Sequence, residues 1–497
     1  MHTTTPAYDA LTRAFEQMHR LGHLQSMAYW DQAANMPPQG SQARAAALSE
    51  VAALLHRLRT DPRLTDELQR ADREALDDAQ RANLREIRRN LARSSALPED
   101  LVQRSSLATS RCEHAWRSQR PANDWAGFLP NLKAVLAVTR EEAHLLAERS
   151  GLSPYDAMLD QYEPGMTSAQ VAAVFGEVGQ WLPGLIRDVC ARQALQPVVR
   201  PHGPFPEAAQ RALCEQVMAL LGFNFQAGRL DVSTHPFSGG VPEDVRLTTR
   251  FREHDFLDSL MSTIHETGHG RYEQNLPRDL LGQPVGEARS MAIHESQSLA
   301  FEMQLARHPG FVGLLAPLLV QTFGDQPAFE PGNLQRLICQ VSPSLIRVEA
   351  DEVTYPAHVI LRFEIEQALI NGQAEAEDIP ALWDAGMMRL LGLDTRGNYR
   401  DGPMQDVHWA EGMFGYFPCY SLGAMYAAQW FATLRRQRPD LDDCIAAGRL
   451  AVVFDWLRDN IWHQASRWTT EELCVRASGA ALDPAHFRAH LQARYLG

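Results

Sequence analysis

Two histidines, His265 and His269, lie four residues apart inside a stretch with helical periodicity. Apolar residues recur along residues 256–275 at the spacing of an amphipathic helix. Residues four apart lie on one helix face with their Cβ atoms roughly 5–6 Å apart, so both imidazoles can reach one ion. The H-E-x-x-H spacing therefore predicts a helix that carries a metal site, and two imidazoles with a carboxylate suit zinc.

A third ligand is expected from the segment that follows this helix. Residues 287–297 also have a helical pattern, and they contain the neighbours His294 and Glu295. Adjacent helical residues diverge by about 100°, so only one of the two can face the ion. We favour Glu295, because two histidines, one glutamate and an open fourth position are typical of catalytic zinc. His294 would then pack or form a hydrogen bond near the cleft.

Glu266 lies about 100° around the helix from His265, where it can hold a water beside the ion without binding the ion itself. The tighter pattern H-E-x-x-H-x-x-G-x-x-H is excluded, since Tyr272 and Asn275 stand where it needs Gly and His. The alternative is a chance match, in which two surface histidines and a solvated glutamate share a helix.

Composition narrows the classes of function. The net charge of −14 opposes binding to nucleic acid or to an anionic membrane. The longest apolar run, residues 311–320, is far shorter than the ~20 residues that span a bilayer. Seven scattered cysteines without a C-x-x-C pair are typical of reduced core residues, and residues 1–7 have no secretory pattern, so we expect a cytoplasmic protein.

The remaining periodicity predicts a mainly α fold. Long helical patterns dominate residues 8–195, and strand-like alternation is scarce. Four prolines within residues 196–206 prevent a continuous helix there, and this stretch is the best boundary between two lobes of a single domain, 1–497. We expect a deep cleft between these lobes. The basic run at residues 85–90 is interpreted as the solvated face of a helix.

A small sheet is predicted just before the metal helix. Residues 231–233 and 245–249 read as short strands around Gly239 and Gly240. The edge of such a sheet, beside the metal site, would bind an extended peptide through main-chain hydrogen bonds. Asp244 and Arg246 would share one strand face, which suits either a structural ion pair or substrate positioning.

Together these residues resemble the zinc carboxypeptidases typified by the thermostable carboxypeptidase Taq. The resemblance runs from W-D-Q at 30–32 to Y-F-P at 416–418, and Cys419 departs from the threonine that is common at that position. The internal landmarks are M-P-P at 36–38, H-P-F at 235–237, D-V-R-L-T at 244–248, the H-E-x-x-H, H-E-S-Q at 294–297, I-R-V-E-A-D at 346–351 and G-P-M-Q-D-V-H-W at 402–409.

The resemblance implies a mostly helical metallopeptidase fold with a deep groove and a homodimer. It implies removal of single residues from peptides with a free C-terminus, with broad side-chain tolerance. It also implies one divalent metal ion per subunit, zinc or sometimes cobalt, held by His265, His269 and Glu295. We expect Glu266 to take a proton from water and to pass it to the leaving amine.

Two further catalytic roles are predicted. His358 could share a helix face with Tyr355 and donate to the developing oxyanion, as Tyr or His donors do in similar zinc peptidases; the alternative is a capped or core histidine. Arg347, in the I-R-V-E-A-D landmark, offers a planar fork for the terminal carboxylate. Its alternative is an internal ion pair with Asp351 or Glu349.

Other substrate contacts are expected from His235, which we predict to be extended because it precedes a proline, and from Tyr420, which we expect to reach the cleft. If their segment is extended, Asp406 and His408 would lie on one face of it, and we interpret both mainly as architectural residues.

Three rival functions stay open. A dipeptidyl carboxypeptidase or an oligoendopeptidase would keep the metal ligands and move or lose the carboxylate clamp. A noncatalytic helical binding protein or chaperone would carry incidental histidines. The sequence has no G-x-S-x-G elbow, phosphate-binding loop or dinucleotide fingerprint, so other enzyme classes have little support.

Overall fold

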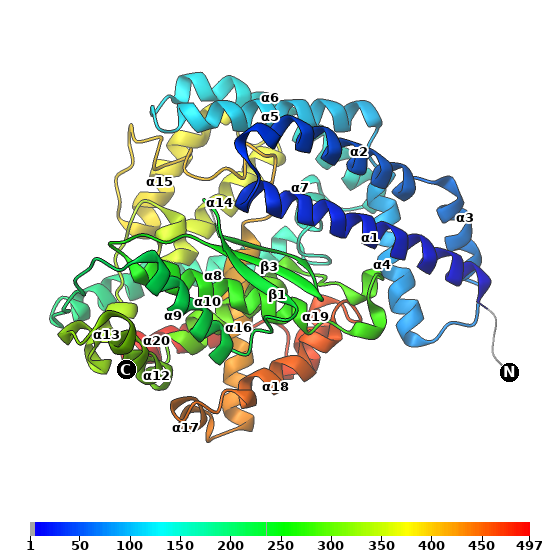
Figure 1. The fold of residues 1–497 in the computed structure, drawn as a ribbon. Helices are drawn as coiled ribbons and strands as arrows, with labels where there is room; N and C mark the ends of the chain where they lie inside the picture. The colour runs from blue at the N-terminus through cyan, green and yellow to red at the C-terminus, as the bar shows by residue number, and fades with distance from the viewer. Residues whose placement is uncertain (1–4, 235) are drawn as a thin grey trace.

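The structure, a computed structural model, describes residues 5–234 and 236–497, and within them the chain forms 20 α-helices and a three-stranded sheet (Figure 1). The prediction of a mainly α class with one small sheet is confirmed. No helix in these ranges is long and apolar enough to cross a membrane.

The helices of the first half are α1 (Pro6–Ala34), α2 (Ser41–Arg59), α3 (Pro62–Ala71), α4 (Asp78–Ser94), α5 (Glu99–Gln119), α6 (Trp125–Ser150), α7 (Pro154–Leu159), α8 (Ser168–Gln193), α9 (Glu207–Leu220) and α10 (Phe256–Gln274). Those of the second half are α11 (Met291–Leu299), α12 (Pro309–Phe323), α13 (Pro331–Ile338), α14 (Tyr355–Ile370), α15 (Ile379–Leu391), α16 (Pro418–Gln437), α17 (Leu441–Ala446), α18 (Ala451–Asn460), α19 (Thr470–Ser478) and α20 (Pro484–Tyr495).

Local chemistry explains where the central helices begin. The carboxylate of Asp255 accepts hydrogen bonds from the backbone N–H groups of Leu257 and Asp258, which caps α10 at the predicted start of the metal helix. The Ser290 hydroxyl caps α11 in the same way by accepting from the Ile293 N–H. The predicted helix at 287–297 therefore begins later than expected, because Ser290 is its cap and residues 287–289 precede it.

The sheet has the order β1-β3-β2, with β1 (Gly228–Val232) parallel and β2 (Phe237–Val241) antiparallel to β3 (Asp244–Thr249). Gly239 and Gly240 lie inside β2, so the prediction of only two strands around this pair was wrong. Gly240 has φ of +107°, and a Cβ there would lie 2.0 Å from the Asp244 carbonyl oxygen, so the β2–β3 turn requires glycine. β3 packs against α10 and thereby places the sheet beside the metal helix.

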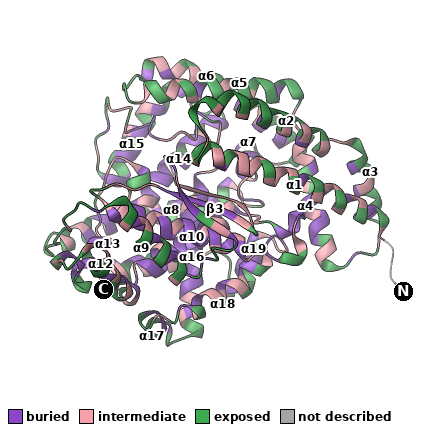
Figure 2. Cartoon of the chain, in the orientation of Figure 1, coloured by how far each residue is buried: buried purple, intermediate pink, exposed green. Residues whose placement is uncertain are grey.

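The hydrophobic interior divides into two clusters. The main cluster runs from Cys112 to Tyr495 and includes α10, α11 and α16, and Figure 2 shows buried residues concentrated around α10 and α16 while α2 and α5 are largely exposed. A smaller cluster belongs to the N-terminal helices α1 to α4. Residues 194–206 join α8 to α9, which both contribute to the main cluster, and the lobe boundary at 196–206 stays a prediction.

Polar groups of α4 connect the N-terminal helices to the main body. Arg85 donates to the carbonyl oxygen of Ser466, and the buried carboxylate of Glu86 pairs with Arg289 at 3.0 Å. Asn83 donates to the Gln283 side chain at 3.0 Å. The prediction of a solvated basic face at residues 85–90 was therefore wrong for Arg85, Glu86 and Arg89, whose side chains bridge two parts of the fold, whereas Arg88 and Asn90 are exposed as predicted.

Candidate metal centre

Two neighbouring helices bring the predicted metal ligands together. His265 and His269 project from α10, and Glu295 projects from α11. The Glu295 Oε2 atom lies 3.9 Å from His265 Nε2 and 3.4 Å from His269 Nε2. One ligand atom from each residue lies within 4.8 Å of the other two, a separation that one ion can bridge.

Glycines allow this close approach. A Cβ at Gly268, inside the H-E-x-x-H motif, would lie 2.5 Å from the carbonyl oxygen of Gln297 on α11. A Cβ at Gly423 on α16 would lie 2.7 Å from Cγ of Glu295. Helices α10, α11 and α16 therefore pack backbone against backbone around the site, which fixes the distance between the two histidines and the glutamate.

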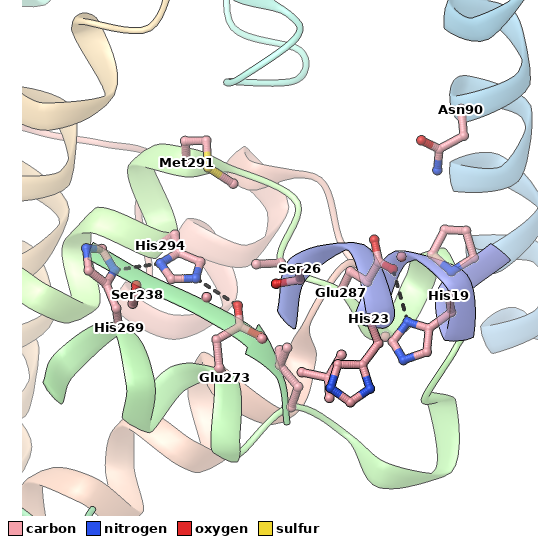
Figure 3. Close-up of a pocket in the computed structure, with 18 of the residues that line it drawn as sticks. His19, His23, Ser26, Asn90, Ser238, His269, Glu273, Glu287, Met291 and His294 are labelled. Atoms are coloured by element: carbon pink, nitrogen blue, oxygen red, sulfur yellow. Dashed lines mark hydrogen bonds and ion pairs between the residues drawn. The ribbon is translucent and has the colours of Figure 1, made fainter. Parts of the chain in front are cut away.

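The outer nitrogens of both histidines have hydrogen-bond partners. His265 Nδ1 lies 3.0 Å from Glu302 Oε2, and Arg307 donates to the other oxygen of that carboxylate at 2.9 Å. His269 Nδ1 lies 2.6 Å from His294 Nδ1 (Figure 3). Both Nε2 atoms are thus left to face Glu295, so the residues present fit a divalent cation with two imidazoles and one carboxylate.

Glu302 is a partner that the sequence-based expectations did not include. It lies in a π-helical segment, Ala300–Ala306, that continues α11. Glu302 follows Glu295 by seven residues, which places both side chains on one face of a regular helix, so this spacing was the signal that could have indicated it. His294, by contrast, lies near the cleft and forms hydrogen bonds, as expected for the neighbour of Glu295.

Burial and nearby charge shape the protonation of the site. Burial raises the pKa of Glu266 to about 7. Burial lowers the pKa of His269 to about 4, which keeps that ring neutral, as a metal ligand must be. Burial also opposes the charged form of His265, but the carboxylates of Glu295 and Glu302 outweigh it and raise its pKa to about 10. Cation binding would displace that proton.

The site opens into a cavity of about 1040 Å³. His265, Glu266, His269 and Glu295 line it together with residues of α1, α4 and β2. Figure 3 shows the α1 side chains His19 and His23 across this cavity from His269. The Oε2 atom of Glu266 is buried there with no hydrogen-bond partner in the described part of the chain. The cavity therefore lies between the N-terminal helices and the metal helices, with the strand β2 along one wall.

Arg347 lies behind this cavity rather than in its lining. Its guanidinium is buried and donates to Asp406 at 2.8 Å and to the Tyr355 hydroxyl at 2.5 Å. The alternative of an ion pair with Asp351 or Glu349 was wrong in its partner, because the acceptor comes from the distant G-P-M-Q-D-V-H-W landmark.

The other predicted substrate contacts are placed differently. Tyr420 lines the cavity, and its hydroxyl lies 3.1 Å from His408 Nε2. His358 is fully buried outside the cavity lining, and burial lowers its pKa to about 3. His235 lies outside the described residues. Asp244 and Arg246 form an ion pair at 2.6 Å that also packs against α1, which agrees with the structural interpretation of that pair.

Comparison with known proteins identifies the family to which the chain is similar. The family model described as Carboxypeptidase Taq (M32) metallopeptidase matches residues 10–495. Thermostable carboxypeptidase 1 of Thermus thermophilus is 38% identical over 506 residues, 99% of each chain. The structure of metallocarboxypeptidase 1 of Trypanosoma cruzi is 46% identical, with a TM-score of 0.98 over 99% of this chain and 100% of that chain. An M32 carboxypeptidase from Deinococcus radiodurans is 32% identical, with a TM-score of 0.92 over 98% of both chains.

The helical fold, with an H-E-x-x-H helix and a glutamate from the next helix at the wall of a deep cavity, defines a metallopeptidase. The chain belongs to the Carboxypeptidase Taq (M32) metallopeptidase family, as its sequence landmarks predicted. It is a metal-dependent carboxypeptidase that acts on peptides. The alternative of a noncatalytic binding protein is wrong, because the curated relatives are enzymes.

Proposed function

We propose that this enzyme releases single amino acids from the free C-terminus of peptides, with broad specificity, and that one zinc ion per subunit is held by His265, His269 and Glu295. The observation that carries the proposal is the convergence of the two free Nε2 atoms on the Glu295 carboxylate at the wall of the cavity. A bound zinc ion supplies a Lewis acid that polarises the peptide carbonyl and makes water easier to deprotonate.

Glu266 is the proposed general base. Its carboxylate lines the cavity, one oxygen has no hydrogen-bond partner among the described residues, and burial brings its pKa to about 7, close to the working pH of a cytoplasmic enzyme. It takes the proton of the attacking water and later delivers it to the leaving amine. Glu266→Gln should therefore keep the zinc content of the wild type and lose turnover. Retained hydrolysis by zinc-loaded Glu266→Gln would reject the assignment.

Arg347 and Tyr420 are proposed to recognise the terminal carboxylate. Support comes from charge: the buried guanidinium groups of Arg347 and Arg362 share the single carboxylate of Asp406, so this wall of the site carries excess positive charge. Tyr420 lies between that charge and the cavity, with the Arg347 guanidinium 4.8 Å from its ring centre. Arg347→Ala should reduce hydrolysis of free-acid peptides far more than that of C-terminally amidated peptides. An unchanged ratio between the two substrates would remove this role.

The roles predicted for two other residues, His358 and His235, do not have this structural support. The donor role of His358 stays a prediction, which comparison of kcat for His358→Phe with the wild type tests, and an unchanged kcat would remove it. The role of His235 at the border of the substrate strand also stays a prediction. The next residues, 236–242, line the cavity and offer the sheet edge along which an extended peptide would lie.

Product analysis separates the proposed activity from its nearest rivals. Digestion of a defined peptide, followed by mass spectrometry, should give a ladder of losses of one residue from the C-terminus. Losses of two residues would indicate a dipeptidyl carboxypeptidase, and internal fragments an oligoendopeptidase. Elemental analysis of the purified enzyme identifies the bound metal, which we expect to be zinc rather than cobalt. The homodimer and the cytoplasmic location remain proposals, which sedimentation and cell fractionation test.

A further inference from the structure

Helix α10 carries an acidic residue, Glu273, on the face that holds the two histidines. Glu273 follows His269 by four residues, as His269 follows His265, so the three side chains form one stripe. The ring of His294 enters from α11 between the last two. Its Nδ1 lies 2.6 Å from His269 Nδ1, and its Nε2 lies 2.8 Å from Glu273 Oε1 (Figure 3).

We infer that Glu273 and His294 are positioning residues that fix the proton of His269 on Nδ1 and so keep its Nε2 lone pair for the metal ion. This inference rests on the proposed metal site and adds residues that act through His269. The inference concerns which nitrogen of the His269 ring carries the proton. Metal affinity and NMR spectroscopy both depend on this property.

The distances allow a single arrangement that binds a cation. Two ring nitrogens 2.6 Å apart must share one hydrogen, because two N–H groups or two lone pairs would repel. The Glu273 Oε1 atom, 2.8 Å from His294 Nε2, is the acceptor in this arrangement, so the proton of His294 lies on Nε2 and its Nδ1 presents a lone pair. His269 then donates from Nδ1, and its Nε2 is free to coordinate.

The opposite arrangement blocks the site. If His294 carried its hydrogen on Nδ1, it would donate to His269 Nδ1 and leave the proton of His269 on Nε2, directed toward Glu295. The His269 ring could not then bind a cation. The acceptor at position 273 therefore selects the form that binds metal.

Packing holds the His294 ring in the required orientation. The buried ring of Tyr272 meets it edge-on, with ring centres 5.2 Å apart. The side chains of His294 and Glu273 are 15% and 22% exposed, so solvent has limited access to replace either hydrogen bond. The carboxylate that supports His265, Glu302, is a separate group on α11's continuation, so the two histidines have independent supports.

Zinc affinity of the metal-free enzyme tests the inference. The Kd is measured by titrating zinc against a competing chromophoric chelator, for the wild type, Glu273→Ala and Glu273→Gln. Loss of a partner of this kind typically weakens metal binding 10- to 100-fold, and we expect that loss for Glu273→Ala. Glu273→Gln keeps a carbonyl oxygen that accepts from His294 Nε2, so its Kd should stay within about threefold of the wild type.

A matched control removes the same charge elsewhere near the cavity. Glu243 is 54% exposed and pairs with Arg278, so Glu243→Ala should bind zinc as the wild type does. Histidine ¹⁵N NMR of the metal-free enzyme, assigned with His294→Gln, should show the proton of His294 on Nε2 and that of His269 on Nδ1.

The outcomes of these experiments distinguish failure of the positioning role from failure of the proposed metal site. Wild-type zinc affinity in Glu273→Ala, an equal loss in Glu273→Gln, or a proton on His294 Nδ1 would overturn the positioning role. Failure of the wild type itself to bind zinc would overturn the proposed metal site instead. If Glu273→Ala does not fold, the NMR assignment and the Glu273→Gln affinity still test the inference.

Discussion

Gly268→Ala tests whether the close approach of α10 and α11 sets the geometry of the metal site. The added Cβ would lie 2.5 Å from backbone atoms of Gln297 and Ser298, whereas ordinary contact begins at 3.4 Å. The helices must therefore separate by about 0.9 Å at that point, and a functional metal site tolerates changes in ligand distance of only about 0.2 Å. Glu295 lies two residues before Gln297, so its carboxylate would move away from His269.

The size of the effect follows from overpacking. Forcing an extra methyl into a packed core costs about 1–3 kcal/mol, and zinc binding would have to restore the original spacing against that strain. Because each 1.4 kcal/mol is tenfold in Kd, zinc affinity should fall about 5- to 150-fold. Folding stability should change less, since alanine stabilises a helix interior by about 1 kcal/mol relative to glycine and offsets part of the strain.

The assay is the competitive zinc titration, with thermal unfolding of the metal-free protein measured in parallel. Gly423→Ala is a second variant, because its Cβ would meet the Glu295 side chain at 2.7 Å as well as the Ala292 carbonyl oxygen at 3.1 Å. Gly176→Ala is the control: this exposed helical glycine has nothing within 4 Å of an added Cβ, so zinc affinity should be unchanged and stability slightly higher. Wild-type zinc affinity in a folded Gly268→Ala would show that the close approach of α10 and α11 does not set the geometry of the metal site.

Three further predictions concern the same structure. Glu302→Ala should weaken zinc binding about 10- to 100-fold in the chelator competition, because His265 Nδ1 loses its carboxylate; an unchanged Kd would contradict this. Glu352→Gln should lower the free energy of unfolding by about 3 kcal/mol at pH 7, since the buried carboxylate pairs with Arg494. Burial opposes the ionised form of Glu352, but Arg494 and His490 outweigh it and hold its pKa below the usual range. Its contribution is therefore present above the unfolded pKa and lost as the pH falls through the folded value. The stabilities of the two proteins should begin to approach each other below about pH 4 and become equal only below the folded pKa. Removal of metal by a chelator should abolish activity, and zinc at 100 times its Kd should raise the free energy of unfolding by about 2.7 kcal/mol; no shift in the unfolding midpoint would contradict a site specific to the folded state.

Much of the fold could be predicted from local signals. The prolines at 62 and 154 stand in the first turns of α3 and α7, where proline is tolerated, and α10 begins at the predicted residue because Asp255 caps it. Strand β2 was missed because Gly239 and Gly240 are poor strand formers and read as a turn. The strand exists because β3 pairs with it, a long-range contact that propensity does not contain.

The residues of the candidate site also divide into those that the sequence indicated and those that it did not. The spacing of His265 and His269 and the following helix were sufficient to place Glu295 near them. Glu302 was missed, although it follows Glu295 by seven residues, a spacing that places both side chains on one helix face. The partner of Arg347 was assigned to nearby acids, whereas Asp406 lies 59 residues away in sequence, and only tertiary structure brings them together.

Anomalous X-ray diffraction at the zinc edge, on crystals of the zinc-loaded enzyme, is the most direct test of the central claim that His265, His269 and Glu295 share one cation. We predict one strong peak per subunit, about 2.0–2.2 Å from both Nε2 atoms and from a carboxylate oxygen of Glu295. A peak ligated by His294 in place of Glu295, or no peak between the two histidines, would show that these three residues do not share one cation.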